Sequence, residues 1–423
     1  MTTWYVDSVS GSDSNGGTAT NDALASFSQV MTAGFTGGDA MYVKGGGATY
    51  AGYNWNTWAT DFRATMVSGY TVTPGDNCSD GSEPPRVIGS SQYSLQPGHA
   101  MNIENFIMEQ DMSPSPWASA IDIGGKYGCF SRNITVHIKD TYTGGNRSGI
   151  IGGQGYRHAY GIRVFADPGV EQYNGQVMSG TGIFRTPQHG CVYDLRNLSF
   201  SQTSGVGTIA YFEGTDHGSG FWDGCFIIGN AAETHTGMYF DYDTNTSGFH
   251  IKNCVFYNLD VGINLETSLA DSAALLATFT GRVIIENCFF VNCRIGIQAE
   301  AGIEFPYIIK NNVFYNCTTA QTSGSFSSVF NNITATENPI DLDNYVLTSY
   351  GKSLLNTIYP AGYTTVGSNP KRDQIYETPI KTKFAIDTSG SLSLGTGDVG
   401  DTVTVSGKSF QKISNSPIVW NVI

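Results

Sequence analysis

The sequence predicts an all-β protein, built mainly as a right-handed, single-stranded parallel β-helix (a solenoid) with an N-terminal cap and a small C-terminal antiparallel β module. A nine-residue motif recurs along the middle of the chain, and no stretch shows a sustained helical period. The composition agrees, because 52 glycines, 12% aromatic residues and only 14% charged residues in 423 suit many short strands joined by tight turns.

The repeated motif is clearest in four segments that begin at Trp222, Ile251, Ile285 and Ile309, so that successive starts lie 29, 34 and 24 residues apart. Weaker copies lie upstream around 103–106, 132–134 and 195–198, and downstream around 329–333. Self-similarity at this period indicates stacked repeats, none of which can bury its apolar face alone. Helical repeats lack support in the periodicity, and propeller blades need about 40 residues each. One coil of three short strands fits the spacing.

Equivalent positions in the motif predict how the coils stack. Asparagine tolerates a left-handed turn, and stacked amides can hydrogen-bond from coil to coil. The asparagines form two columns: Asn253, Asn287 and Asn311, and then Asn258, Asn292 and Asn316. The cysteines form two interior columns: Cys225, Cys254 and Cys288, and then Cys293 and Cys317. We interpret these cysteines as small buried apolar residues rather than disulfides, since the chain has no CxxC and no zinc-like spacing.

Another strand of each coil begins with a glycine, at Gly237, Gly262 and Gly296. Alternation along these strands puts Met238, Phe240, Ile263, Leu265, Ile297 and Ala299 inward. The residues between them are then outward. They include one column of carboxylates, Asp241, Glu266 and Glu300, beside a column of polar side chains, Tyr239, Asn264 and Gln298.

The carboxylate column allows three interpretations. Coils stacked about 4.8 Å apart bring neighbouring carboxylates close enough to raise one another's pKa. Such a pair can supply the acid and the base or nucleophile of glycoside hydrolysis, with Tyr239, Asn264 and Gln298 binding sugar. The same oxygens could bind Ca²⁺, the one cofactor considered. The third interpretation is a solvated acidic face. The column therefore holds candidates, and no catalytic residue is assigned.

The first residues carry a recognisable pattern: Trp4-Tyr-Val-Asp-Ser, a polar loop from Gly11 to Gly17, and the strand Gly38-Asp-Ala-Met-Tyr-Val-Lys-Gly. This pattern resembles the N-terminal entry of the pectate-lyase-like β-helix superfamily, in which a strand and a polar loop precede a short helix and a Gly-Asp-x-Val-Tyr-Val strand opens the first coil. Ala40 and Met41 depart slightly from it. The resemblance implies a cap on the open end of the solenoid. It does not imply an activity, since the superfamily includes lyases, hydrolases, epimerases and non-enzymes.

A lyase of that superfamily would need an Arg or Lys base beside carboxylates that bind Ca²⁺. No pairing of Asp-x-x-Asp with Arg-x-x-Arg occurs on these coils. The catalytic residues of the family are therefore carried over to no position of this sequence.

The chain divides into an N-terminal cap with entry strands (1–50), the parallel β-helix (51–340), an irregular connector (341–375) and a small β module (376–423). The module alternates apolar and polar residues between Gly and Asp turns, which is typical of antiparallel strands. Its ending, Gly407-Lys-Ser-Phe-Gln-Lys with Pro417-Ile-Val-Trp, resembles short C-terminal modules of bacteriophage structural proteins.

Charge and hydropathy exclude some classes of partner. Lys and Arg total 22 against 36 Asp and Glu, a net charge of −14, which disfavours nucleic acid and anionic membrane surfaces. No apolar run approaches the roughly 20 residues of a membrane span. The N-terminus has neither the basic region nor the apolar region of a secretory signal peptide, so we expect no membrane association and no such export.

These features favour a non-enzymatic phage virion structural protein, either a capsid decoration or cement protein or a tail-associated component. On that hypothesis the chain is located in the virion, forms a homotrimer and contacts other virion proteins. The alternative is a tailspike-type glycan depolymerase, a glycoside hydrolase acting on host surface polysaccharide, which would use the carboxylate column. A cellular polysaccharide enzyme or adhesin is the third class considered.

Overall fold

The computed structural model describes residues 1–55, 64–78, 82–89, 93–96, 98, 100–110, 119–122, 129–139, 151–152, 157–172, 178–181, 188–200, 207–213, 219–241, 248–266, 283–299, 305–321, 326–358, 385–386, 392–393, 402–405, 408–415 and 418–422. They fall into two compact units, Met1–Pro379 and Ile380–Ile423.

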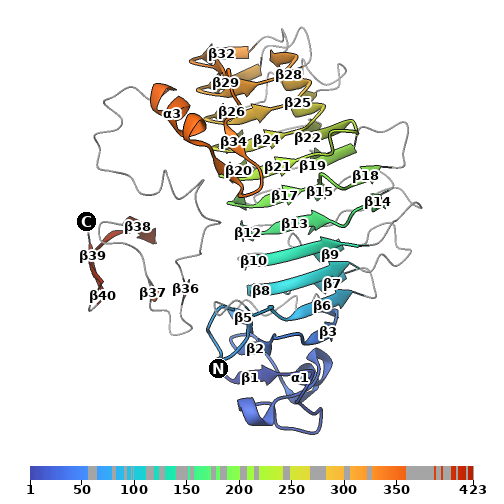
Figure 1. Ribbon diagram of the computed structural model, residues 1–423. Helices are drawn as coiled ribbons and strands as arrows, with labels where there is room; N and C mark the ends of the chain where they lie inside the picture. Colours follow the sequence, from blue (N-terminus) through green and yellow to red (C-terminus); the bar gives the residue numbers. More distant parts are fainter. Residues whose placement is uncertain are drawn as a thin grey trace. The chain divides into compact units, whose positions relative to one another are not determined.

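The first unit is a parallel β-helix in which each coil contributes three strands (Figure 1). The first strands are β2 (Ala40–Lys44), β5 (Thr65–Tyr70), the beginnings of β8 (Met101–Gln110) and β10 (Cys129–Ile138), β12 (Arg157–Tyr160), β16 (Gln188–His189), β20 (Ser219–Asp223), β23 (Gly248–Lys252), β26 (Val283–Glu286), β29 (Phe305–Lys310) and β32 (Phe326–Phe330). The second strands are β3 (Thr49–Ala51), β6 (Arg86–Gly89), the ends of β8 and β10, β13 (Arg163–Ala166), β17 (Val192–Asp194), β21 (Phe226–Ile228), β24 (Val255–Tyr257), β27 (Phe289–Val291), β30 (Val313–Tyr315) and β33 (Ile333–Thr334).

The third strands form a separate ten-stranded parallel sheet. They are β4 (Tyr53–Asn54), β7 (Tyr93–Gln96), β9 (Ser119–Asp122), β11 (Ile151–Gly152), β15 (Met178–Thr181), β19 (Gly207–Glu213), β22 (His235–Asp241), β25 (Val261–Glu266), β28 (Ile295–Ala299) and β31 (Thr319–Gln321). First and second strands share one 21-stranded sheet that also contains β1 (Thr3–Val6), and β14 (Glu171–Gln172) pairs separately with β18 (Ser199–Phe200). The predicted parallel β-helix is confirmed.

The corners of the coils are set by residues with positive φ, as the asparagine columns predicted. Both columns adopt the left-handed conformation, with φ between 50° and 57°, at Asn253, Asn287, Asn311, Asn258, Asn292 and Asn316. In the second column the amides form the expected ladder: Asn292 Nδ2 donates to Asn258 Oδ1 at 3.1 Å, and Asn316 Nδ2 donates to Asn292 Oδ1 at 3.0 Å. In the first column Asn253 donates instead to Asp223, at 2.7 Å.

The lumen is filled by apolar columns. Cys225, Cys254 and Cys288 are fully buried and unbridged, and Cys191 extends their column by one coil. Phe256, Phe290 and Phe314 stack face to face, with ring centroids 4.9 and 5.0 Å apart. Strands β22, β25 and β28 approach this stack so closely that a Cβ on Gly262 would lie 2.7 Å from Phe290 Cδ1, and Gly237 and Gly296 face Phe256 and Phe314 in the same way.

The N-terminal cap consists of β1, a 3₁₀ turn (Thr20–Asp22) and α1 (Phe27–Ala33). Strand β1 pairs in parallel with β2, so the ladder of the solenoid starts within the cap. Asp39, from the Gly-Asp dipeptide noted above, accepts hydrogen bonds from the backbone N–H of Thr2 at 2.6 Å, from Trp4 Nε1 at 3.1 Å and from the backbone N–H of Thr36 at 3.1 Å. One carboxylate thus ties the first strand to the loop before β2.

Residues 335–358, here called the strap, depart from the irregular connector predicted from residue 341. They contain the antiparallel pair β34 (Ile340–Asp341) and β35 (Val346–Leu347), and the helix α3 (Ser349–Ile358) (Figure 1). The strap packs on the outer face of the second strands, whose outward residues are apolar. The buried outward row is Val192, Phe226, Val255, Phe289 and Val313. These strands need a cover because both of their faces are apolar.

The described strands of the second unit are all antiparallel, as predicted for the C-terminal module. It contains a pair, β36 (Ala385–Ile386) and β37 (Leu392–Ser393), and a three-stranded sheet, β38 (Thr402–Val405), β39 (Lys408–Asn415) and β40 (Ile418–Val422). Across the described part of the whole chain, no helix is long and apolar enough to cross a membrane.

Candidate functional site

The backbone register brings together the carboxylates predicted to form a column. Asp241, the last residue of β22, pairs in register with Glu266, the last residue of β25. Glu213, the last residue of β19, pairs with Asp241 from the preceding coil. Glu300 and the side chains of the other three lie outside the described residues. The described register therefore aligns three carboxyl-bearing positions, one per coil, and Glu213 is a member that the sequence reasoning did not include.

The polar column beside these positions is described in full. Tyr239, Asn264 and Gln298 are register partners on β22, β25 and β28, and all three are half-buried. Their neighbours Met238, Phe240, Ile263, Leu265 and Ile297 are buried in the lumen, so the predicted alternation of these strands is confirmed. The third strands thus present a polar outer row two residues before the carboxyl-bearing positions.

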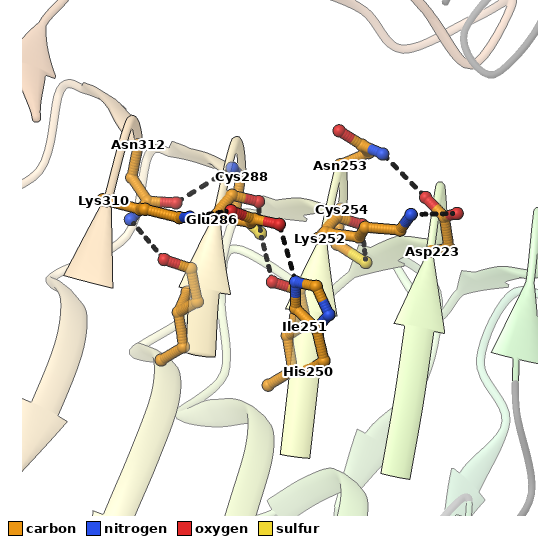
Figure 2. Close-up of polar contacts among 11 residues, drawn as sticks. Asp223, His250, Ile251, Lys252, Asn253, Cys254, Glu286, Cys288, Lys310 and Asn312 are labelled. Atoms are coloured by element: carbon orange, nitrogen blue, oxygen red, sulfur yellow. Dashed lines mark hydrogen bonds and ion pairs between the residues drawn. The ribbon is translucent and has the colours of Figure 1, made fainter. Parts of the chain in front are cut away.

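A second polar row lies on the outer face of the first strands. It consists of the last residue of each strand, just before the corner, and its charges alternate from coil to coil: Asp223, Lys252, Glu286 and Lys310 (Figure 2). Lys252 Nζ lies 3.2 Å from Asp223 Oδ2, and Lys310 Nζ lies 2.7 Å from Glu286 Oε2. Alternating signs avoid the repulsion that like charges would cause at one coil spacing.

His250 joins this row diagonally. Its Nε2 lies 2.7 Å from Glu286 Oε1, and Figure 2 shows the other ring nitrogen pointing away from Glu286. The hydrogen bond from His250, followed by the ion pair with Lys310, lowers the pKa of Glu286 to about 2, although burial opposes the shift. Because an ionised carboxylate can only accept, His250 Nε2 carries a proton, and in the neutral form of this imidazole the lone pair is on Nδ1.

Phe221 holds this histidine from the preceding coil. The two rings meet edge to face with centroids 5.6 Å apart, and Lys252 Nζ lies 4.9 Å from the centroid of Phe221. One aromatic ring thus contacts both an imidazole and an ammonium group. The sequence reasoning missed this row, although the repeat alignment contained the signal: the residue before each corner reads Asp, Lys, Glu, Lys in the four clearest copies of the motif.

Metal binding gains no support from the described geometry. No group of three or more His, Cys, Asp or Glu side chains among the described residues could hold a metal ion. The calcium site suggested for the carboxylate column depends on side chains outside that part of the chain and stays a prediction.

No protein-family model matches this chain, and no curated protein matches it. Three solved structures that resemble it are a rhamnogalacturonan lyase (14% identity, 75% of this chain and 74% of that one, TM-score 0.40), a GH136 lacto-N-biosidase from Eubacterium ramulus (11%, 78% and 67%, 0.36), and a mannuronic acid specific polysaccharide family 6 lyase from human gut microbiota (11%, 70% and 78%, 0.24). By name, all three are glycan-degrading enzymes.

This finding contradicts the prediction of a non-enzymatic phage virion structural protein, which was wrong. That prediction rested on end signatures and on low charge density, features that do not distinguish a structural solenoid from an enzymatic one. The identities and TM-scores are low, so the substrate and reaction of this chain have to be argued from its own residues.

Proposed function

We propose that this chain is a glycan depolymerase of the tailspike type, which cleaves a polysaccharide by acid–base catalysis at the carboxylate column of the third strands. The observation that carries the proposal is the register of Glu213, Asp241 and Glu266, three carboxyl-bearing positions at the same place in successive coils. Parallel strands lie about 4.8 Å apart, close to the separation of roughly 5 Å between the carboxyl groups of retaining glycosidases.

The chemistry requires these side chains to share the outer face with Tyr239 and Asn264. Two carboxyl groups one coil apart cannot both ionise easily, so one keeps its proton at a pH where the other is charged. The protonated group would donate to the leaving oxygen, and the ionised one would act as nucleophile or base. Tyr239, Asn264 and Gln298 would supply hydrogen bonds along a glycan lying parallel to the stack of coils.

The proposal is tested by measuring new reducing ends after incubation with a panel of bacterial surface polysaccharides. We expect cleavage by the unmodified protein and a loss of at least about 100-fold in Asp241→Asn and Glu266→Gln, the usual scale for removing a general acid or base. Asp260→Asn is the matched control. Asp260 is a carboxylate of the same coil as Glu266, but both of its oxygens accept hydrogen bonds from Arg294, from Nε at 2.5 Å and from Nη2 at 2.8 Å.

The control should cleave as fast as the unmodified protein. Unchanged cleavage in both column variants would remove the column as the site, and a complete absence of new reducing ends across the panel would count against a depolymerase. Location on a virion, assembly as a homotrimer and action on a host surface polysaccharide are further parts of the tailspike hypothesis and stay predictions.

A further inference from the structure

His250 and Glu286 form a pair whose chemistry differs from that of the carboxylate column. The imidazole is anchored through Nε2 to an ionised carboxylate, and its side chain is 33% exposed while that of Glu286 is 17% exposed. A base whose orientation and tautomer are fixed by a carboxylate is one half of the arrangement that activates nucleophiles in hydrolases. The other ring nitrogen, Nδ1, is the atom that could accept a proton.

The other half of that arrangement is a nucleophile, and the described outward side chains of these strands do not supply one. The outward positions described on β20, β23, β26 and β29 are Phe221, Asp223, His250, Lys252, Ile284, Glu286, Ile308 and Lys310, and none of these bears a hydroxyl or a thiol. Among these described side chains, a proton acceptor would act on a water molecule.

Glycoside hydrolysis does not fit this pair, because it needs a carboxylic acid that donates a proton to the leaving oxygen. Glu286, whose pKa is held at about 2 by His250 and Lys310, stays ionised across the working range of most enzymes. Both of its oxygens are also engaged, Oε1 by His250 and Oε2 by Lys310. The pair is suited to removing a proton from water, not to protonating a sugar oxygen.

Hydrolysis of an ester needs this base and a positive group for the oxyanion that forms. Lys252, whose ammonium also pairs with Asp223 Oδ2 at 3.2 Å, supplies the positive group. Its ammonium lies over Phe221, the same ring against which His250 packs, so base and cation belong to one patch. His250 and Lys252 are also on the same face of one strand, two residues apart, or about 7 Å along it.

We propose that His250, oriented by Glu286, is the general base of an esterase site that removes O-acyl groups, such as acetyl groups, from a glycan. His250 Nδ1 takes a proton from water as the water oxygen bonds to the ester carbonyl carbon. The carbonyl oxygen becomes an oxyanion near Lys252. The bond from that carbon to the sugar oxygen then breaks, and the sugar oxygen takes the proton from His250. The products are a carboxylic acid and a free sugar hydroxyl, and the imidazole is again neutral.

In this scheme His250 is the catalytic residue and Glu286 is a positioning residue. That the ester is carried by a glycan rests on the proposed depolymerase function, whereas the ester chemistry itself rests only on the described face. The two proposals concern different sheets, so their failures can be distinguished.

The experiment measures the release of nitrophenol from p-nitrophenyl acetate and of acetate from an O-acetylated bacterial polysaccharide. His250→Gln should lower both rates by at least about 100-fold, the range expected for a general base. Glu286→Gln should lower kcat at least tenfold and leave KM unchanged, since the substrate does not touch Glu286. Added imidazole should restore part of the rate in His250→Gly, which a purely structural histidine would not allow.

His137→Gln is the matched control, because free imidazole groups hydrolyse nitrophenyl esters slowly. His137 is half-buried and packs edge to face on Phe165, with centroids 6.4 Å apart, much as His250 packs on Phe221. It should keep the full rate. Lys310→Met controls for stability, since it removes an ion pair of Glu286 without touching the histidine, and the thermal midpoint of each variant shows whether it is folded.

Equal rates for the unmodified protein and a folded His250→Gln variant on both esters would overturn the proposal. Asp241→Asn and Glu266→Gln should keep the esterase rates while losing any production of reducing ends. Esterase activity on the small ester without cleavage of any polysaccharide would leave the ester site standing and count against the depolymerase. Cleavage of a polysaccharide without ester hydrolysis would support the depolymerase and count against the ester site.

Discussion

The hydroxyl of Tyr345 donates a hydrogen bond to Asp194 Oδ2 at 2.6 Å, joining residues 151 positions apart in the sequence. Asp194 is only 5% exposed. Arg196, from the same coil, donates hydrogen bonds from Nε and Nη2 to the Asp194 carboxylate oxygens at 2.6 to 3.1 Å. The ring of Tyr345 also packs edge to face on Phe226, with centroids 5.9 Å apart. This cluster pins the middle of the strap to the side of the solenoid.

Replacing Tyr345 by Phe should therefore weaken the attachment of the strap while keeping the aromatic ring packed against Phe226. The buried carboxylate of Asp194 keeps Arg196 and loses one donor, so we expect a loss of about 1–2 kcal/mol in the free energy of unfolding. Urea denaturation followed by circular dichroism measures it. Tyr350→Phe is the control, because the Tyr350 hydroxyl bonds Thr336 at the exposed surface of the same segment and should change stability by less than about 0.5 kcal/mol. Equal losses in the two variants would contradict the assigned role of Asp194.

The strap also shows where prediction from the sequence stopped. The coils could be predicted because their signals are local and repeated: asparagine at the corners of several coils, a glycine near the start of β22, β25 and β28, and alternation along the strands. The strap occurs once, and its helix α3 lies in a short, polar stretch whose apolar residues are meaningful only against the row from Val192 to Val313. That contact joins distant segments, so no repeat reveals it.

Of the two candidate sites, one could be predicted from the sequence and the other could not. The register of Asp241 and Glu266 follows from the period of the repeat and was predictable. The pairing of His250 with Glu286 crosses one coil diagonally, because His250 is in register with Ile284 and not with Glu286. A side chain long enough to reach a neighbouring column selects its partner by rotamer and competing charges, which the alignment of repeats does not contain.

His235 should make the fold sensitive to mild acid. It is fully buried, its Nδ1 accepts the backbone N–H of Asn230 at 3.2 Å, and burial lowers its pKa from 6.5 to about 4. The unfolded chain binds a proton below pH 6.5 and the folded chain does so only near pH 4, so stability is complete above pH 6.5 and is lost as the pH falls through that window. A shift of this size corresponds to about 3 kcal/mol.

Urea midpoints measured between pH 7.5 and 4.5 test this dependence, which His235→Gln should flatten. His137→Gln is needed beside it, because burial also lowers the pKa of His137. The carboxylates with lowered pKa, including Glu286 and Asp7 at about 2, lose their contribution only below about pH 4.5. An unchanged slope in His235→Gln would show that the acid sensitivity arises elsewhere.

Two substitutions of Asn292 should separate the stability that comes from the left-handed corner from the stability that comes from the amide hydrogen bonds. Its φ is 55°, and its side chain both donates to Asn258 and accepts from Asn316. Asn292→Gly keeps the left-handed backbone and loses the two hydrogen bonds, for a cost of about 1–3 kcal/mol. Asn292→Ala adds the left-handed penalty of an alanine, about 1–2 kcal/mol. Urea denaturation should rank the unmodified protein above the glycine variant and the glycine variant above the alanine variant; equal stability of the two variants would mean that the corner relaxes.

The cysteine column should behave as packing and not as a redox element. Cys191, Cys225, Cys254 and Cys288 are fully buried and unbridged, and burial raises the pKa of the Cys225 and Cys288 thiols well above the usual value. A thiol that solvent does not reach is unreactive. We therefore expect dithiothreitol to leave the thermal midpoint unchanged, and the four thiols to react with Ellman's reagent only after unfolding. Cys254→Ser should cost about 1–3 kcal/mol by placing a hydroxyl in the apolar lumen, and Cys254→Ala should cost less. A midpoint that falls under reducing conditions would reveal a disulfide and contradict the packing interpretation.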